Sequence, residues 1–317
     1  MEIITANEQL LDMKDNYFKG KLPKIKNSKI IFNGKNNFFF CDDSVVLSNS
    51  KIEFNGDNSI VFLSKNNHDY KLSVSLCNNS TIYIGKNNYF NGILNVILSE
   101  ETNFFIGNHC LFSFDIWIRT ADPHLIYAVE GKKRINLSKS VYIGDHVWIG
   151  QSVMILKGCQ IDSGSIVGAG SIVSGKLIEN NTIYAGNPAK LVKKRIFWDK
   201  ACVHKWTKRD TQKSLKYSKF LNNSSNDVTQ YIYSFNKKEQ ISYNLIENTL
   251  LSKSSVEKYE YLMKIYNNEL KNRFVHMHPI KIAIKLNKKI NNIKQILKKI
   301  IKKIKETNKY LSSEKKG

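Results

Sequence analysis

Several features that would place a chain in a common functional class are missing from this sequence. Only five of the 317 residues are cysteine, and they show neither CxxC nor paired Cys/His spacing, which indicates reduced thiols rather than a disulfide or zinc framework. No run of about 18 apolar residues is present to form a transmembrane helix. The N-terminal stretch MEIITANEQLLDMKDN carries acidic residues and lacks the apolar core of a secretory signal. We therefore expect a cytoplasmic protein without a bound metal.

Common nucleotide-binding and hydrolase motifs are missing as well. There is no Walker A sequence and no dinucleotide-binding GxGxxG; Gly164, Gly168 and Gly170 belong instead to the turns of a repeat. A GxSxG elbow is also absent, which disfavours a serine hydrolase.

Positive charge is abundant and unevenly placed. The formal net charge is +22, and the residues after Leu270 contribute fifteen Lys/Arg against two Glu. Such a bias favours anionic partners, namely acidic glycans, lipid headgroups or nucleic acid, although a basic tail that is merely solvated is an alternative.

The strongest pattern in the sequence is a six-residue repeat between Val141 and Val173. Isoleucine or valine recurs at every sixth position, and a second register two residues earlier carries small or β-branched side chains. The first register consists of Ile143, Ile149, Ile155, Ile161, Val167 and Val173. A period of six suits strands but would scatter this stripe around a helix. It predicts a triangular coil in which each short flat side points one aliphatic residue toward a common axis.

A looser repeat precedes this block. The segments around Gly34 and Gly56 are 22 residues apart, as are those around Gly85 and Gly107, and we interpret them as longer coils of the same solenoid. Between Arg119 and Ser140 the polar insertion TADPHLIYAVEGKKRINLSK interrupts the repeat. An interruption of this length predicts a loop ejected from one corner, and such loops often carry function.

The remainder of the chain divides into three predicted regions. Residues 1–20 form an N-terminal cap, residues 21–196 the solenoid, and residues 197–317 a basic, mostly helical extension. Helical spacing covers residues 254–275, and residues 281–305 show a heptad seam with ten lysines and no acid. That last segment has three interpretations: a peripheral helix on an anionic membrane, packing within the chain, or oligomerisation.

The repeat, together with HVWIG (146–150), ILKG (155–158), IVGAGSIV (166–173) and AGNPAK (185–190), resembles the hexapeptide-repeat acyltransferases. The bacterial sialic acid, polysialic acid and capsule O-acetyltransferases are the most similar. The resemblance implies a mainly β fold, a left-handed parallel β-helix, with a loop extruded at about 120–138. It is dense in motifs from about 82 to 196 and absent after about 210.

The same resemblance implies acetyl transfer from acetyl-CoA to a sugar hydroxyl. The segment RTADPH, ending at His124, matches the loop that carries the family's catalytic histidine. A sugar hydroxyl needs a base to remove its proton as it attacks the thioester, and a histidine, with an ordinary pKa of about 6.5, suits that task. Either Asp122 or Glu130 would orient the ring. Transfer is expected to be direct, without an acyl-enzyme.

Further site residues follow from the resemblance. Trp148 should point outward, because the solenoid axis favours small aliphatics, and the matching family residue lies beside the histidine; a tryptophan packed under the loop is the alternative. The acetyl-CoA-binding residues implied by the motifs are Gln151, Ala169, Ser174, Lys190 and Lys193. The two lysines would neutralise phosphates, or they are ordinary surface charges. The family also implies a homotrimer with active sites between subunits.

Three functions remain open at this point. The first is an O-acetyltransferase acting on a bacterial surface glycan, such as a capsular polysaccharide or lipooligosaccharide, that is sialylated or otherwise anionic. The second is an acetyltransferase for a small sugar, a nucleotide sugar or an antibiotic. The third is a solenoid that binds membrane or nucleic acid without catalysis, which the absence of a recognition motif disfavours, so we expect no nucleic-acid partner.

Overall fold

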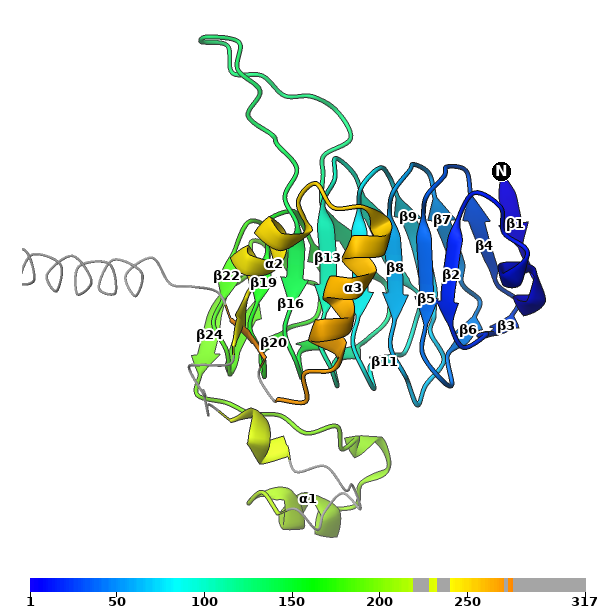
Figure 1. Ribbon diagram of the computed structural model, residues 1–317. Coiled ribbons are helices and arrows are strands. Elements are labelled where there is room, and N and C mark those ends of the chain that lie inside the picture. Colours follow the sequence, from blue (N-terminus) through cyan, green and yellow to red (C-terminus); the bar gives the residue numbers. More distant parts are fainter. Residues whose placement is uncertain (219–227, 233–239, 271–272, 276–317) are drawn as a thin grey trace, which may run out of the picture. The chain divides into compact units, whose positions relative to one another are not determined.

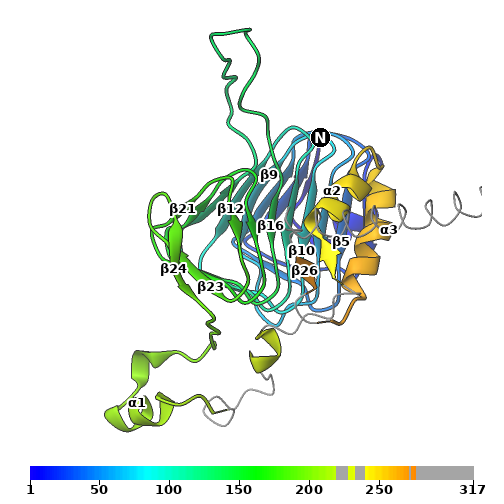
Figure 2. The same cartoon turned by 90° about the vertical axis from the view of Figure 1, so that its left-hand side faces the viewer.

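The computed structural model describes residues 1–218, 228–232, 240–270 and 273–275. Met1–His276 forms one compact unit, whose centre is a parallel β-solenoid with three flat sides (Figure 1, Figure 2). Each coil adds a strand to each side in turn. The first sheet contains β1 (Glu2–Ile4), β4 (Lys29–Phe32), β7 (Lys51–Phe54), β9 (Leu72–Leu76), β12 (Leu94–Leu98), β15 (Ile116–Arg119), β18 (Met154–Ile155) and β21 (Ile172–Val173).

The other two sides complete the triangle. The second sheet contains β2 (Tyr17–Gly20), β5 (Phe38–Cys41), β8 (Ile60–Leu63), β10 (Thr81–Ile84), β13 (Asn103–Ile106), β16 (Val141–Ile143), β19 (Gln160–Ile161) and β22 (Leu177–Ile178). The third side begins with the pair β3 (Lys24–Lys26) and β6 (Val46–Ser48) and continues with β11 (Tyr89–Phe90), β14 (Leu111–Phe112), β17 (Trp148–Ile149), β20 (Ile166–Val167), β23 (Thr182–Ala185) and β24 (Lys190–Lys194). Strand pairing is parallel except at the two ends, where β1 pairs with β4 and β23 with β24 in the antiparallel sense.

The strand register confirms both predicted repeats. Ile30 pairs with Ile52 in the early coils, an offset of 22, whereas Tyr142 pairs with Gln160 in the later coils, an offset of 18. All residues of the predicted inward register, from Ile143 to Val173, are fully buried. The longer coils hold aromatic rings at the axis, such as Phe32 stacked on Phe54 at 4.5 Å. The longer coils thus mix aromatic and aliphatic side chains in the core, whereas the 18-residue coils from Val141 to Ile178 bury only isoleucine, valine and cysteine there.

The interruption after β15 is a long loop that leaves the solenoid at the corner between the first and second sheets, as predicted (Figure 1). An antiparallel bridge between Tyr127 and Arg134 closes it into a narrow hairpin. Since β16 resumes the pairing with β13, the solenoid continues beneath the insertion without a break.

Two helices cover the outer face of the second sheet: α2 (Tyr243–Leu250) and α3 (Ser255–Tyr266) (Figure 1). That face presents aromatic rings in successive coils, which pack against the helices in a second hydrophobic cluster. The sheet contributes Phe38, Phe40, Phe62, Tyr83, Phe105 and Tyr142 to this cluster. At about 1.5–3 kcal/mol per fully buried large side chain, this packing accounts for the docking of the helices.

The prediction of a helix over 254–275 is wrong beyond Tyr266. Asn267 and Asn268 end α3, because asparagine competes for backbone hydrogen bonds and is a poor helix former. Phe274–Val275 is instead the short strand β26, which pairs with β25 (Ile241–Ser242). The N-terminal segment contains the 3₁₀ helix η1 (Asn7–Leu11).

A buried ion pair holds β26 on the solenoid. The Arg273 guanidinium contacts the Asp145 carboxylate at 2.8 Å, and both side chains are almost completely buried. The Arg273 amide and the Asn108 amide also donate to that carboxylate, at 2.9 and 2.7 Å. Burial alone would raise the pKa of Asp145, but the charge and hydrogen bonds of Arg273 outweigh it, so the pKa is lowered. Asp145 lies in the solenoid turn between β16 and β17, and the pair joins this turn to a residue 128 positions later in the chain.

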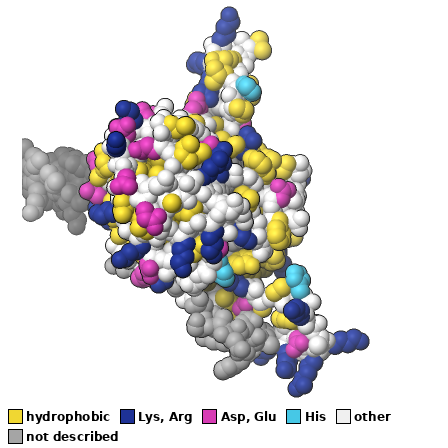
Figure 3. Space-filling model, turned by 90° about the vertical axis from the view of Figure 1, so that its right-hand side faces the viewer, with side chains coloured by type: hydrophobic (Ala, Val, Ile, Leu, Met, Phe, Trp, Pro, Cys, Tyr) yellow, Lys and Arg dark blue, Asp and Glu magenta, His cyan; other side chains and the backbone are white. Residues whose placement is uncertain are grey.

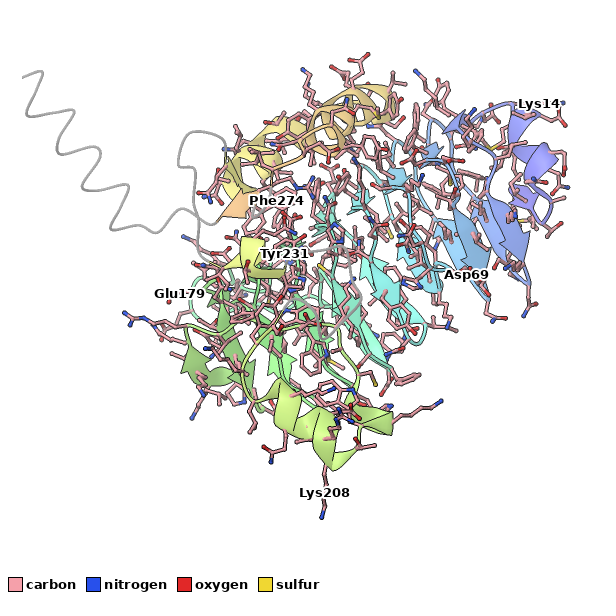
Figure 4. All side chains as sticks on the ribbon, turned by 90° about the horizontal axis from the view of Figure 1, so that it is seen from below. Lys14, Asp69, Glu179, Lys208, Tyr231 and Phe274 are labelled. Carbon is pink, nitrogen blue, oxygen red and sulfur yellow. The ribbon has the colours of Figure 1, made fainter. Side chains whose placement is uncertain are left out.

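Between the solenoid and the helix pair, the chain forms η2 (Val203–Lys205), α1 (Lys208–Ser214) and η4 (Val228–Tyr231). His146 is buried between the rings of Trp198 and Tyr231, at centroid distances of 4.0 and 4.3 Å. Trp198 exchanges hydrogen bonds with His146, its Nε1 donating to the His146 carbonyl at 3.0 Å. Seen from below, Tyr231 and Phe274 lie against the later coils (Figure 4). The returning chain is therefore fixed to the solenoid at the turn before Trp148.

No helix within the described ranges is long and apolar enough to cross a membrane. The predicted basic helix over 281–305 lies outside the described residues.

Breaking the buried ion pair should destabilise the whole unit. Asp145→Ala leaves the Arg273 charge buried without its partner, which costs about 3–5 kcal/mol in the free energy of unfolding. Urea denaturation monitored by circular dichroism measures this loss. The matched control is Asp15→Asn, which removes the exposed Lys35 pair and should cost less than about 1 kcal/mol. Equal effects of the two substitutions would contradict this role for Asp145.

Buried His146 should make stability depend on pH below neutrality. Burial lowers the pKa of His146 to about 4, against the opposing hydrogen bond to the Trp198 carbonyl. The unfolded chain therefore binds one more proton between pH 6.5 and 4, and stability is lost as the pH falls through this window, by up to about 3 kcal/mol. Urea titrations at pH 7, 5.5 and 4.5 should show this slope, and His146→Gln should reduce it. An unchanged slope in the variant would exclude His146 as its source.

Candidate active site

His124 lies in the extruded loop, and its side chain is exposed. Its main-chain carbonyl accepts a hydrogen bond from Asn136 Nδ2 at 2.7 Å, across the base of the hairpin. The Asn136 side-chain oxygen accepts from the Ile126 amide at 2.9 Å. One asparagine thus fixes the backbone on both sides of Leu125, while the imidazole of His124 is exposed.

The rest of the loop base is a network of charged groups. Lys157, from the next coil at the same corner, donates to the Asp122 carboxylate at 2.5 Å and to the Asn136 carbonyl at 3.1 Å. Asn136 Nδ2 also donates to Asp122 at 3.2 Å. The hydrogen bond from Lys157 is the main reason that the pKa of Asp122 is lowered. Asp122 therefore stays ionised in the lysine contact at neutral pH.

The partners of Asp122 bear on its predicted role. In the described part of the chain its carboxylate bonds to Lys157 and Asn136, and no hydrogen bond joins it to the His124 ring. Glu130, the other candidate, is exposed in the same loop. Asp122 contacts the group that holds the His124 backbone, whereas its orientation of the ring stays a prediction.

A second clamp closes the far strand of the hairpin. Arg134 forms two hydrogen bonds to Glu100, at 2.6 and 2.9 Å, and Ser138 donates to the same carboxylate at 2.5 Å. These bonds, with the Arg134 bond largest, lower the pKa of Glu100 to about 2. The loop is thus anchored to the coil before it by Glu100 and to the coil after it by Lys157.

Trp148 lies on the third side of the solenoid and points outward, as predicted, with 38% of its surface exposed. Its ring is tilted against Trp198 at a centroid distance of 5.9 Å. Trp198 is itself buried on His146, so the chain that follows the solenoid returns to support Trp148 from one side. The loop of His124 leaves from a different corner of the solenoid. Trp148 therefore packs against Trp198 and not under that loop.

The predicted cofactor residues occupy exposed positions on two corners and one edge strand. Gln151 and Ala169 occupy equivalent turns of adjacent coils between the third and first sheets, and the Gly170 amide donates to the Gln151 carbonyl at 2.7 Å. Ser174 follows β21 at the corner of the extruded loop. Lys190 and Lys193 are exposed on β24, the last strand of the third sheet.

These placements separate the predicted residues into two groups. His124, Asp122 and Ser174 belong to the corner between the first and second sheets, whereas Trp148 and Gln151 belong to the third side and the corner that follows it. The full width of the first sheet lies between the two corners. One chain therefore does not bring His124 and Trp148 together.

Sequence reasoning missed the residues that hold the loop. Asn136 lies within the polar insertion and Lys157 within the motif ILKG, but their spacing from His124 gives no sign of a contact. Trp198 stands beside Phe197 in a basic segment, and nothing in the local sequence predicts its contact with His146. Among the described residues no three His, Cys, Asp or Glu side chains form a group that could hold a metal ion.

Comparisons with known proteins agree with this architecture. The sequence profile described as bacterial transferase hexapeptide (six repeats) matches residues 140–175. A polysialic acid O-acetyltransferase of Escherichia coli O1:K1 / APEC is 38% identical over 102 residues, which are 32% of this chain and 33% of that protein. The chain thus matches about a third of the length of this curated relative.

Two crystal structures share the fold over most of their length. The polySia-specific acetyltransferase NeuO is 32% identical with a TM-score of 0.55, and the match covers 63% of this chain and 93% of that chain. The polysialic acid O-acetyltransferase OatWY is 27% identical with a TM-score of 0.51, covering 62% and 97%. The chain therefore belongs to the hexapeptide-repeat acyltransferases, the left-handed β-helix family of these polysialic acid O-acetyltransferases.

Proposed function

We propose that this protein transfers an acetyl group from acetyl-CoA to a hydroxyl of a bacterial surface glycan, a capsular polysaccharide or lipooligosaccharide, that is sialylated or otherwise anionic. The observation that carries the proposal is the exposed His124 on the loop that leaves a hexapeptide solenoid, with its main-chain carbonyl held by Asn136. The names of the relatives support the glycan, and the net charge of +22 favours an acidic acceptor.

His124 is proposed as the general base. Its imidazole takes the proton of the sugar hydroxyl while the oxygen attacks the thioester carbonyl, and the proton then passes to the departing thiolate. A positioned base of this kind contributes about 10²–10⁴-fold to the rate. Asn136 and Lys157 fix the backbone that carries the ring. Little conformational entropy is therefore lost when the ring is positioned for the reaction.

We propose that the active enzyme is a homotrimer whose sites lie between subunits. The separation of His124 from Trp148 within one chain supports this arrangement, since a neighbouring solenoid could supply the missing group. The loop also exposes apolar side chains that a second subunit would cover (Figure 3), namely Leu125, Ile126, Tyr127, Val129, Ile135 and Leu137. Val129 is 96% exposed, which is unfavourable for a loop that stays in water.

Acetyl-CoA fits the other group of residues. Gln151 and Ala169 lie on adjacent coils, so an extended pantetheine arm could follow this corner toward β24. Lys190 and Lys193 on that strand would neutralise the phosphates as point charges. The donor would supply the activated acetyl thioester, and Trp148 would pack beside it. A reducing, cytoplasmic location is consistent with five free cysteines.

Removing the base should abolish transfer without loss of the cofactor. His124→Ala is expected to reduce the rate of acetyl transfer by about 10²–10⁴-fold, because the hydroxyl then keeps its proton. The assay follows release of CoA thiol with oligosialic acid, neutral glycans and free sugars as acceptors. The control His204→Ala changes another exposed histidine and should be fully active. Acetyl-CoA affinity, measured by calorimetry, should be the same in both variants; an active His124→Ala enzyme would refute the mechanism.

Shared sites should be visible by complementation. His124→Ala and Trp148→Ala homotrimers should each be nearly inactive, because every site lacks one group. In a trimer reassembled from equal amounts of the two, about a quarter of the interfaces combine an intact His124 with an intact Trp148, so activity should return to roughly that level. Sedimentation analysis would verify the trimer. A monomer, or mixed subunits that recover nothing, would exclude sites shared between subunits.

A further inference from the structure

A polar pocket lies at the corner between the first and second sheets, where the turn between α2 and α3 closes over the solenoid. Four of the lining residues come from three successive coils, and the others come from α2, α3 and the turn between them. The residues that matter for its chemistry are Asn79, Glu101, Glu247, Leu251, Ser252 and Lys258. This is the corner from which the His124 loop leaves one coil later.

At this corner the residue type in the left-handed turn position changes next to the pocket. Asn36, Asn58 and Asn79 occupy equivalent turns with φ of 54–57°, a left-handed conformation that asparagine tolerates. In the following coil Glu101 takes this position with φ of 60°, and Glu100 before it has φ of 53°. Glutamate is not favoured in this region, and backbone strain of this kind concentrates at functional sites.

Glu100 and Glu101 accept hydrogen bonds from different parts of the chain. Glu100 holds Arg134 and Ser138 of the catalytic loop. Glu101 lines the pocket, where its carboxylate accepts a hydrogen bond from Asn79 Nδ2 at 2.7 Å. A ligand bound at Glu101 would therefore sit one residue from the anchor of the loop that carries His124.

The pocket offers donors, acceptors and an apolar surface together. Lys258 is buried and donates to the carbonyls of Asn58 and Asn79, at 3.2 and 2.5 Å, which leaves one of its three N–H groups without a protein acceptor in the described residues. Burial lowers the pKa of Lys258 to about 8, and the charge of Glu101 opposes this effect. The Glu247 carboxylate accepts from Asn103 Nδ2 at 3.1 Å and from the Tyr142 hydroxyl, and it keeps further lone pairs.

We propose that this pocket is an acceptor subsite that binds the vicinal hydroxyl groups of a sugar residue. Adjacent hydroxyls would donate to the carboxylates of Glu101 and Glu247 and accept from the ammonium of Lys258. Leu250 and Leu251 would pack against the C–H face of the same residue. Two carboxylates against one ammonium repel an anionic group, so the subsite takes the uncharged polyol part of the chain.

This inference rests on the proposed function in one respect: the sugar is taken to belong to the acceptor glycan. A free sugar carries the same vicinal hydroxyl groups and could also bind there. In a polymeric acceptor, one residue would be held here while another residue of the same chain reaches His124, so binding would improve with chain length.

Direct binding tests the subsite independently of catalysis. Calorimetry and saturation-transfer NMR on the full chain would use a sialic acid tetramer, maltotetraose and methyl glucoside as probes. Glu101→Gln keeps the contact with Asn79 but removes the charge, and Leu251→Ser removes the apolar surface at an exposed position. Each should weaken tetramer binding about tenfold, the loss expected for one hydrogen bond to a charged group or one apolar contact. Leu245→Ser, at an exposed leucine of α2 outside the pocket, is the matched control and should bind normally.

The outcomes separate the subsite from the proposed function. His124→Ala should bind the tetramer as the native chain does, since the pocket is intact. If the native chain transfers no acetyl group but binds the tetramer through Glu101 and Leu251, the subsite stands and the proposed function fails. If transfer occurs and the KM for the tetramer rises about tenfold in both variants, both stand. Unchanged affinity and KM in both pocket variants, tetramer binding no stronger than that of methyl glucoside, or no binding of any probe would overturn the subsite.

Discussion

The constraint on which this structure depends is that every coil must bury its inward side chains and pair its strands with the coils on both sides. A side chain of the wrong size, or an extra residue on a flat side, would break the stack for all later coils. Extra residues can leave only at a corner, where the backbone already turns. The hairpin of residues 120–140 leaves in this way, and β16 resumes the register directly beneath it. A rigid stack thus presents a loop without being weakened by it.

A stack of this kind leaves its outer faces to be used or covered. On the second sheet the outward aromatic rings would form a large exposed apolar surface, and α2 and α3 cover it. The third side remains open at Trp148, supported by Trp198 and His146. The chain that follows the solenoid therefore covers the outer face of the second sheet and supports Trp148 on the third side. Asp145, next to His146, holds the sealing segment through Arg273.

The sequence predicts the solenoid well because its signal is periodic and local. Each inward position repeats every six residues, so burial from Ile143 to Val173 follows from spacing alone, and the outward direction of Trp148 follows by exclusion. Asn136 and Lys157 could not be found in this way, because their contacts join the loop to a neighbouring coil. The apolar spacing that predicts this helix continues past Asn267 toward a strand, so it places the end of α3 too late. The pocket at Glu101 depends on segments 146 residues apart, Glu101 and Glu247, which no pattern links.

The rigidity of the solenoid also limits how the proposed chemistry can be assembled. His124 and Trp148 are held by corners and sides that a stacked core fixes in place, so no hinge within the described solenoid can bring them together. Closure of the loop would have to break the bonds from Glu100 and Lys157 that hold its base. Those bonds are short and join four charged side chains, Glu100, Arg134, Lys157 and Asp122, which makes them costly to lose. In the proposed trimer a second subunit would complete the site without that loss, so a shared site costs less free energy here than a moving loop.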